Sequence, residues 1–128
     1  MKKNVLMLVL ITFVSISYVN AQSWTNWSDW KTTSCFKGVD FRVKSKKTST
    51  GKYEMYVEFK NRYYKDVHFN YEAKGGDYTT KNNRVTVKAG ETRKSWTGAS
   101  FTSDYFYVYI DKLRFERDGL QDYANCDK

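Results

Sequence analysis

Hydrophobic and polar residues alternate with a period of two along most of this chain. In residues 39–44, for example, Val39, Phe41 and Val43 share one side of an extended chain, and the charged residues between them share the other. This alternation indicates half-buried β-strands, because successive strand side chains point to opposite faces of a sheet. The alternating runs are 39–44, 53–60, 67–73, 85–89 and 105–115.

Turn-forming residues gather between these runs, and no stretch of the chain after residue 21 has a helical period. Short strands that are separated by frequent turns predict an all-β fold, an antiparallel β-sandwich of about seven strands over residues 36–115.

The last run changes its parity after Ile110. A β-bulge adds one residue to a strand and so moves the following side chains to the other face. We therefore expect a bulge at Asp111 and Lys112 that returns Leu113 and Phe115 to the core face.

Residues 1–21 have a different pattern. Two lysines precede an apolar stretch over residues 5–19, and the small residue Ala21 follows. This arrangement predicts a signal helix that is cleaved on export, since the stretch is shorter than the ~20 residues of a bilayer-spanning helix. We expect a secreted or periplasmic protein that has no membrane span after cleavage.

Removal of the signal leaves 107 of the 128 residues, enough for one domain, and lowers the formal charge from +8 to +6. We divide this part into a tryptophan-rich segment, 22–35, and a sandwich domain, 36–128. Its basic residues are scattered, which favours a soluble basic surface and gives no reason to expect a nucleic-acid partner. Acidic glycans or anionic headgroups are the alternative partners.

The chain has two cysteines, Cys35 and Cys126, which lie at the two ends of the predicted strands. An even number of cysteines in an exported chain predicts a disulfide, and two cysteines allow only one pairing. This bridge would close the sandwich domain.

Three tryptophans, Trp24, Trp27 and Trp30, are spaced by three residues before Cys35. The segment is similar to the opening of a thrombospondin type 1 repeat, and this resemblance implies tryptophans layered against arginines. The chain departs from such repeats because it has one cysteine pair where they have three disulfides. A spacing of three also does not fit strand alternation, so we expect a segment that packs along the sandwich and buries one or two rings.

Residues 36–115 as a whole resemble the immunoglobulin-like and fibronectin-type-III-like modules of exported bacterial proteins. The segments that carry this resemblance are 36–44, 53–61, 67–73 and 85–92. It implies a sandwich architecture, but the Cys…Trp…Cys core spacing of antibody domains is missing and no binding residue can be carried over.

Little in the sequence supports catalysis. His68 is the only histidine and alternates onto a polar strand face, and both cysteines are assigned to the bridge. Glu54 and Glu58 share a strand face but lie about 13 Å apart, and only a cross-strand pair such as Glu58 with Glu72 could come closer. We expect a non-catalytic protein without metal or cofactor, and a small secreted hydrolase is the lowest-ranked alternative.

Aromatic residues are the main candidates for a binding site. Tyr105, Tyr107 and Tyr109 alternate along one face of the last predicted strand, with rings ~6.6 Å apart, the scale of one sugar residue. With Trp27 and Trp96, they form our predicted ligand-binding face for a polysaccharide or an extracellular or envelope protein. In the alternative, the same rings are core and the chain is a structural or assembly protein of the envelope that self-associates through sheet edges.

Overall fold

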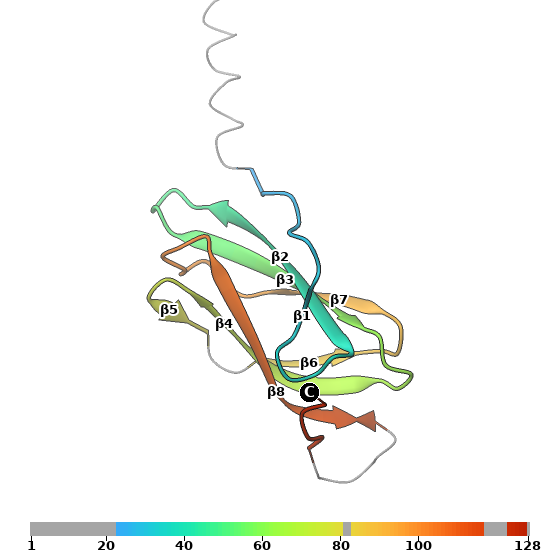
Figure 1. Ribbon diagram of the computed structural model, residues 1–128. Coiled ribbons are helices and arrows are strands. Elements are labelled where there is room, and N and C mark those ends of the chain that lie inside the picture. Colours follow the sequence, from blue (N-terminus) through green and yellow to red (C-terminus); the bar gives the residue numbers. More distant parts are fainter. Residues whose placement is uncertain (1–22, 81–82, 117–122, 128) are drawn as a thin grey trace, which may run out of the picture.

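The computed structural model describes residues 23–80, 83–116 and 123–127, so the predicted signal helix lies outside the described residues. The prediction of an all-β chain of antiparallel sheets is confirmed (Figure 1). The strands are β1 (Lys31–Thr32), β2 (Val39–Lys47), β3 (Tyr53–Asn61), β4 (Val67–Gly75), β5 (Tyr78–Thr79), β6 (Asn83–Val87), β7 (Thr92–Trp96) and β8 (Phe106–Phe115). The described residues thus form eight strands against about seven expected, and β1 and β5 have only two residues each.

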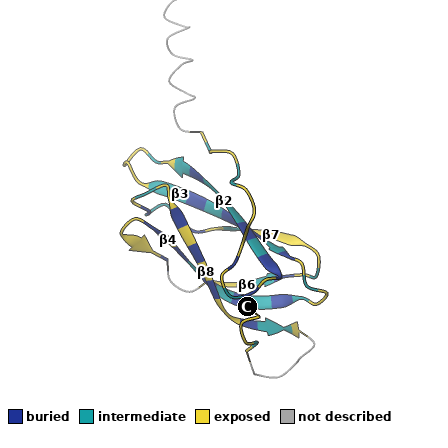
Figure 2. Ribbon diagram, viewed as in Figure 1, coloured by how far each residue is buried: buried dark blue, intermediate teal, exposed yellow. Residues whose placement is uncertain are grey.

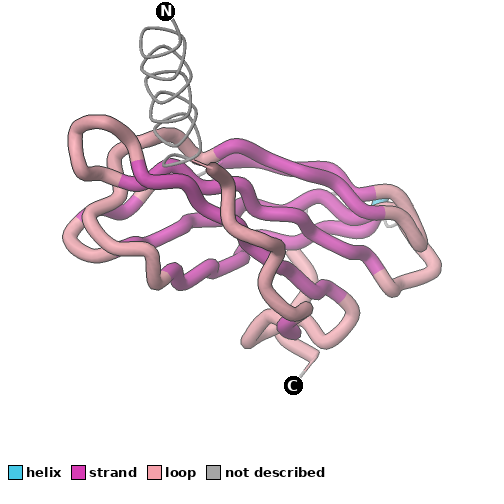
Figure 3. Tube along the Cα trace, turned by 90° about the horizontal axis from the view of Figure 1, so that it is seen from above, coloured by secondary structure: helices cyan, strands magenta, loops and turns pink. Residues whose placement is uncertain are grey.

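The strands form two sheets. The first sheet has the order β1-β2-β3-β7. In the second sheet β8 pairs along almost the whole of β4, so the shorter β5 and β6 share the opposite side of β4. Strand β8 is therefore an edge strand of the second sheet. Figure 3 shows the strands running side by side in two layers.

One hydrophobic core fills the space between the sheets (Figure 2). The ring of Phe59 in β3 lies 4.9 Å from that of Phe69 and 5.0 Å from that of Tyr71, both in β4. The hydroxyl of Tyr71 reaches the Ser95 hydroxyl of β7 in the other sheet. The alternating runs predicted these inward positions, because every second residue of β4 from Val67 to Ala73 is buried.

The predicted bulge is also present. The register between β4 and β8 shifts between His68 and Asn70, and Lys112 has a positive φ of 50°. Leu113 is fully buried beyond the bulge, and Phe115 packs against the core. An extra residue at Lys112 explains the change of parity that the sequence shows.

The disulfide between Cys35 and Cys126 joins residues 91 positions apart. Around it, the Asp127 N–H donates to the Cys35 carbonyl, and the Ala124 N–H donates to the Leu113 carbonyl. The C-terminal segment is thereby fastened both to the chain before β2 and to the end of β8.

Candidate functional site

Three exposed tyrosines, which we call the tyrosine row, lie on the outer face of β8 and just before it. Tyr105, Tyr107 and Tyr109 are 62%, 49% and 50% exposed. The alternative in which these rings are core is therefore wrong. The ring centroids of Tyr105 and Tyr107 lie 5.1 Å apart, those of Tyr107 and Tyr109 lie 6.4 Å apart, and the latter two rings are within 16° of parallel.

The rings of the tyrosine row also interact with one another. The Tyr107 hydroxyl is hydrogen-bonded to that of Tyr105, which raises the pKa of the Tyr107 phenol. A hydrogen bond that favours the neutral phenol has this effect on the pKa. The first two rings also contact each other directly, with centroids 5.1 Å apart, which restricts how each of them can turn.

A row of polar side chains on β4 runs beside the tyrosine row. Tyr109 is paired with Glu72 and Tyr107 with Lys74 across the strands. Neighbouring strands lie about 4.8 Å apart, so these polar groups stand within reach of whatever covers the rings. Further along β4, Asn70 accepts a hydrogen bond of 2.9 Å from Arg84 of β6.

In the other sheet, residues 23–30 run along the edge of β2, beyond the part that pairs with β1. The Thr25 and Ser28 N–H groups donate to the carbonyls of Ser45 and Val43, both at 2.8 Å. The Thr25 and Ser28 hydroxyls accept hydrogen bonds from the N–H groups of the same two β2 residues, both at 3.0 Å. The hydroxyls of Thr25 and Ser28, which are three residues apart, thus take the place of the backbone carbonyls with which a neighbouring strand would accept these hydrogen bonds.

The same spacing of three brings the tryptophans over the basic residues of β2. We call this set the tryptophan ladder: Trp24, Trp27, Trp30, Arg42, Lys44 and Lys46. The Lys44 ammonium lies 5.3 Å from the Trp24 ring and 4.8 Å from the Trp27 ring. The Arg42 guanidinium lies 4.9 Å from the Trp27 ring and 4.5 Å from the Trp30 ring. Tryptophans and cations therefore alternate, as the resemblance of this segment implied, with lysines as well as an arginine.

Two carboxylates accompany the cations of the ladder. Glu58 of β3 is only 5% exposed and its carboxylate lies 2.6 Å from Arg42. Glu54 lies 3.2 Å from Lys46. The pair of Glu58 with Glu72 that the sequence left open does not form, because Glu58 and Glu72 belong to different sheets.

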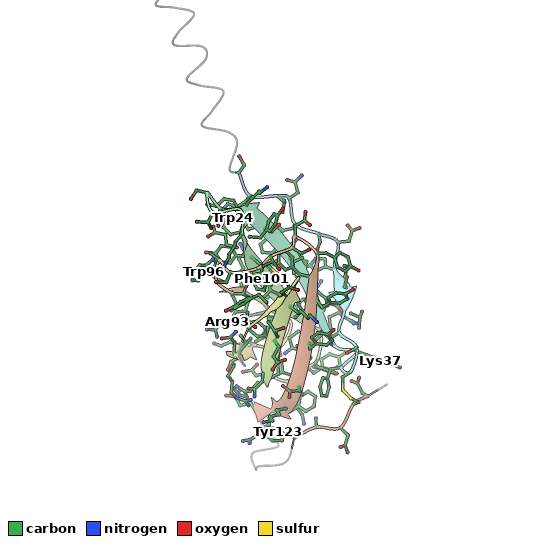
Figure 4. The ribbon with its side chains drawn as sticks, turned by 90° about the vertical axis from the view of Figure 1, so that its left-hand side faces the viewer. Trp24, Lys37, Arg93, Trp96, Phe101 and Tyr123 are labelled. Atoms are coloured by element: carbon green, nitrogen blue, oxygen red, sulfur yellow. A yellow bond between two sulfur atoms is a disulfide. The ribbon has the colours of Figure 1, made fainter. Side chains whose placement is uncertain are left out.

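The predicted site residues thus fall into two groups. Trp27 is half-buried beneath Arg42 and Lys44. Trp96 is 55% exposed and pairs with Tyr56 of β3. Figure 4 shows Trp96 on the same side of the molecule as Trp24. Neither Trp27 nor Trp96 joins the tyrosine row, because they lie on the outer face of the other sheet.

Sequence reasoning also missed a pair of carboxyl groups at the end of β8. Asp66 and Glu116 are hydrogen-bonded to each other, which raises the pKa of Glu116, and the pKa of Asp66 is lowered, mainly by a hydrogen bond from the Ala89 N–H. They lie beside a cavity of about 520 Å³ that is lined by Tyr64, Lys65, Asp66, Ala89 and Glu116. Only the pairing of Val67 with Phe115 brings the two carboxyl groups together, and sequence alone does not give that register.

His68 lies on the polar face of β4, where its Nδ1 is 2.6 Å from the Thr86 hydroxyl. Within residues 23–80, 83–116 and 123–127, no three His, Cys, Asp or Glu side chains gather as metal ligands would. The same residues contain no helix that is long and apolar enough to cross a bilayer.

No known protein family, curated protein or solved structure matches this chain. The candidate site therefore rests on its own geometry.

Proposed function

We propose that this chain is an exported, non-catalytic binding module whose tyrosine row takes an extended polysaccharide. The observation that carries the proposal is the exposure of Tyr105, Tyr107 and Tyr109 in one line. Aromatic rings that are held open to solvent on a rigid sheet suit ligands with apolar faces and polar edges, and sugars have both.

The surroundings of the tyrosine row favour a neutral sugar chain. The ring spacings of 5.1 and 6.4 Å are on the scale of successive sugar residues. Glu72 offers hydrogen-bond acceptors and Lys74 offers donors, and their opposite charges leave this strip without a strong preference for an anion. Hydroxyl groups of a glycan chain would be hydrogen-bonded by this polar row while its rings lie on the tyrosines.

The exposed row supports binding over a structural or assembly role in which the aromatics are core. An envelope or extracellular protein is the second candidate ligand, because exposed tyrosines also suit protein contacts. The disulfide is compatible with an extracellular or periplasmic location. The likeness to immunoglobulin-like modules belongs to the same proposal, since such sandwiches are common scaffolds of exported binding proteins.

The test is a glycan-array screen with the mature protein, followed by affinity measurements on Tyr107→Ala. We expect this variant to lose about 1–3 kcal/mol of binding free energy, roughly 5–150-fold, because one well-placed ring is removed. Its thermal unfolding should change little, since Tyr107 is half-exposed.

The matched control is Tyr64→Ala, because Tyr64 is fully exposed and lies outside the tyrosine row. This control should retain the affinity for the glycan. The proposal is overturned if Tyr107→Ala binds every glycan as the unchanged protein does, or if it loses stability without any effect on a ligand.

A further inference from the structure

One edge of the second sheet is open along half its length. β8 pairs with β4 on one side, and on its other side Phe106–Ile110 has no backbone partner within the described residues. Further along β8, the Ala124 N–H donates to Leu113, so the C-terminal segment covers that half of the edge.

The other edges that are longer than two residues are protected. β7 carries the two adjacent cations Arg93 and Lys94, and β6 carries Arg84. The edge of β2 is covered by Thr25 and Ser28. Proteins protect exposed edges with charges, proline or covering segments, and an uncharged, proline-free edge is a template for pairing. Residues 105–110, Tyr-Phe-Tyr-Val-Tyr-Ile, have none of these protections.

The inward side chains of β8 are also slightly exposed to solvent along this open edge. Phe106, Val108 and Ile110 are 8%, 8% and 7% exposed, although they belong to the core. Their partners on β4, Tyr71 and Ala73, are fully buried. Solvent therefore reaches the core slightly at β8 but not at β4, and a further strand beside β8 would exclude it.

We propose that the strand that pairs there is β8 of a second copy of this chain, antiparallel about a two-fold axis at Val108. In this register Phe106 lies opposite Ile110 of the second copy, so the two cores join. Tyr107 lies opposite Tyr109 of the second copy, so two tyrosine rows lie side by side on one continuous face. Cross-strand aromatic pairs stabilise antiparallel strands.

Charge complementarity supports this register. An axis at Val108 brings Asp104 of each copy opposite Lys112 of the other, at both ends of the paired segment. A shift of the axis to Tyr107 removes both of these pairs, and a shift to Tyr109 replaces them with Asp104 opposite Arg114, which lies beyond the bulge. The bulge at Lys112 then ends the pairing, because the strand turns away there. The pairing uses the strand edge and leaves the rings facing outward, so it does not depend on a glycan.

The test is sedimentation velocity of the mature protein over a concentration series without glycan. We expect a reversible dimer. The variant Tyr107→Lys/Tyr109→Lys places like charges opposite each other twice and should weaken dimerisation by about tenfold or more. The variant Tyr107→Lys/Tyr109→Glu places opposite charges at the same positions and should recover the dimer.

Tyr64→Lys is the control for added charge and should dimerise as the unchanged protein does, because Tyr64 lies near Phe115 at the far end of β8, outside the paired segment 106–110. Hydrogen exchange gives a second measurement on the unchanged protein, since amides within 106–110 should exchange more slowly as concentration rises. A protein that stays monomeric with concentration-independent exchange overturns the proposal. A Lys/Glu variant as monomeric as the Lys/Lys variant overturns the register.

Discussion

Replacement of Trp27 by alanine tests whether the tryptophan ladder fastens the N-terminal segment. Trp27 lies in the middle of the ladder, between the Lys44 ammonium at 4.8 Å and the Arg42 guanidinium at 4.9 Å. The Lys94 ammonium of β7 lies 5.8 Å from the same ring. Alanine removes all these contacts and leaves the backbone hydrogen bonds of Thr25 and Ser28 in place.

The expected loss of unfolding free energy follows from the buried area of the Trp27 ring and from its cation–π contacts. A tryptophan that is about half-buried removes on the order of 100 Å² from water, which contributes ~2.5 kcal/mol. Two cation–π contacts at a partly exposed site add ~0.5–1 kcal/mol each, though such contributions are not fully additive. We expect Trp27→Ala to lower the free energy of unfolding by about 3–4 kcal/mol, or the melting temperature by roughly 13–18 °C.

The assay is urea unfolding followed by circular dichroism, with Trp96→Ala as the control. Trp96 has the same ring but is 55% exposed and lies outside the tryptophan ladder, so its removal should cost about 1–2 kcal/mol less than the removal of Trp27, the contribution of the cation–π contacts. A double-mutant cycle of Trp27→Ala with Lys44→Met should give a coupling of ~0.5–1 kcal/mol. Arg42 is unsuitable for the cycle, because its removal would leave the buried Glu58 without its partner. Equal losses for the two tryptophan variants, with no coupling, would refute the role of the ladder.

Three further predictions concern the junction of the chain ends. Cys35→Ser/Cys126→Ser should lower stability by about 4–5 kcal/mol on the chain-entropy argument, measured by urea unfolding. Gly38→Ala should cost ~1–3 kcal/mol in thermal unfolding, because its Cβ would lie 2.4 Å from the Tyr63 ring, and Tyr63→Leu should relieve part of that loss. Hydrogen bonds from the Tyr63 hydroxyl and from a backbone N–H lower the pKa of Asp127 in the folded protein. The ionised Asp127 carboxylate therefore stabilises the fold above the ordinary pKa of an aspartate, and this stabilisation is lost as pH falls below about 4. Asp127→Asn should therefore flatten the acid side of a stability–pH curve, and an unchanged curve would contradict this assignment.

Periodicity was sufficient to predict the strands with one buried face, because burial forces the alternation on them. It did not predict β7, whose inward positions Arg93 and Ser95 are polar and leave no hydrophobic signal. The bulge at Lys112 could be predicted, because the core on both sides of it requires a change of parity. The disulfide followed from the cysteine count and the expectation of export.

The candidate site could be predicted only in part. Alternation placed the tyrosine row on one face, but its exposure depends on β8 being an edge strand, and strand order is set by contacts between distant residues. The cations of the tryptophan ladder, such as Arg42 and Lys44, look like ordinary outward residues of β2. Their contacts with Trp27 arise because residues 23–30 run along β2, and the sequence alone does not show this path.

The outer faces of the two sheets both carry aromatic side chains, but these side chains have different roles. On the first sheet the ring of Trp27 is occupied by cations of the same chain, so its interaction energy holds a segment in place. On the second sheet Tyr107 contacts its neighbours in the tyrosine row and remains half-exposed, so most of its interaction energy is still available to a ligand. The two substitutions should thus affect different properties: Trp27→Ala should lower stability, and Tyr107→Ala should lower the affinity for the ligand. Because both rings are aromatic and partly exposed, this contrast tests whether a ring's neighbours, rather than its type, decide which of the two tasks it performs.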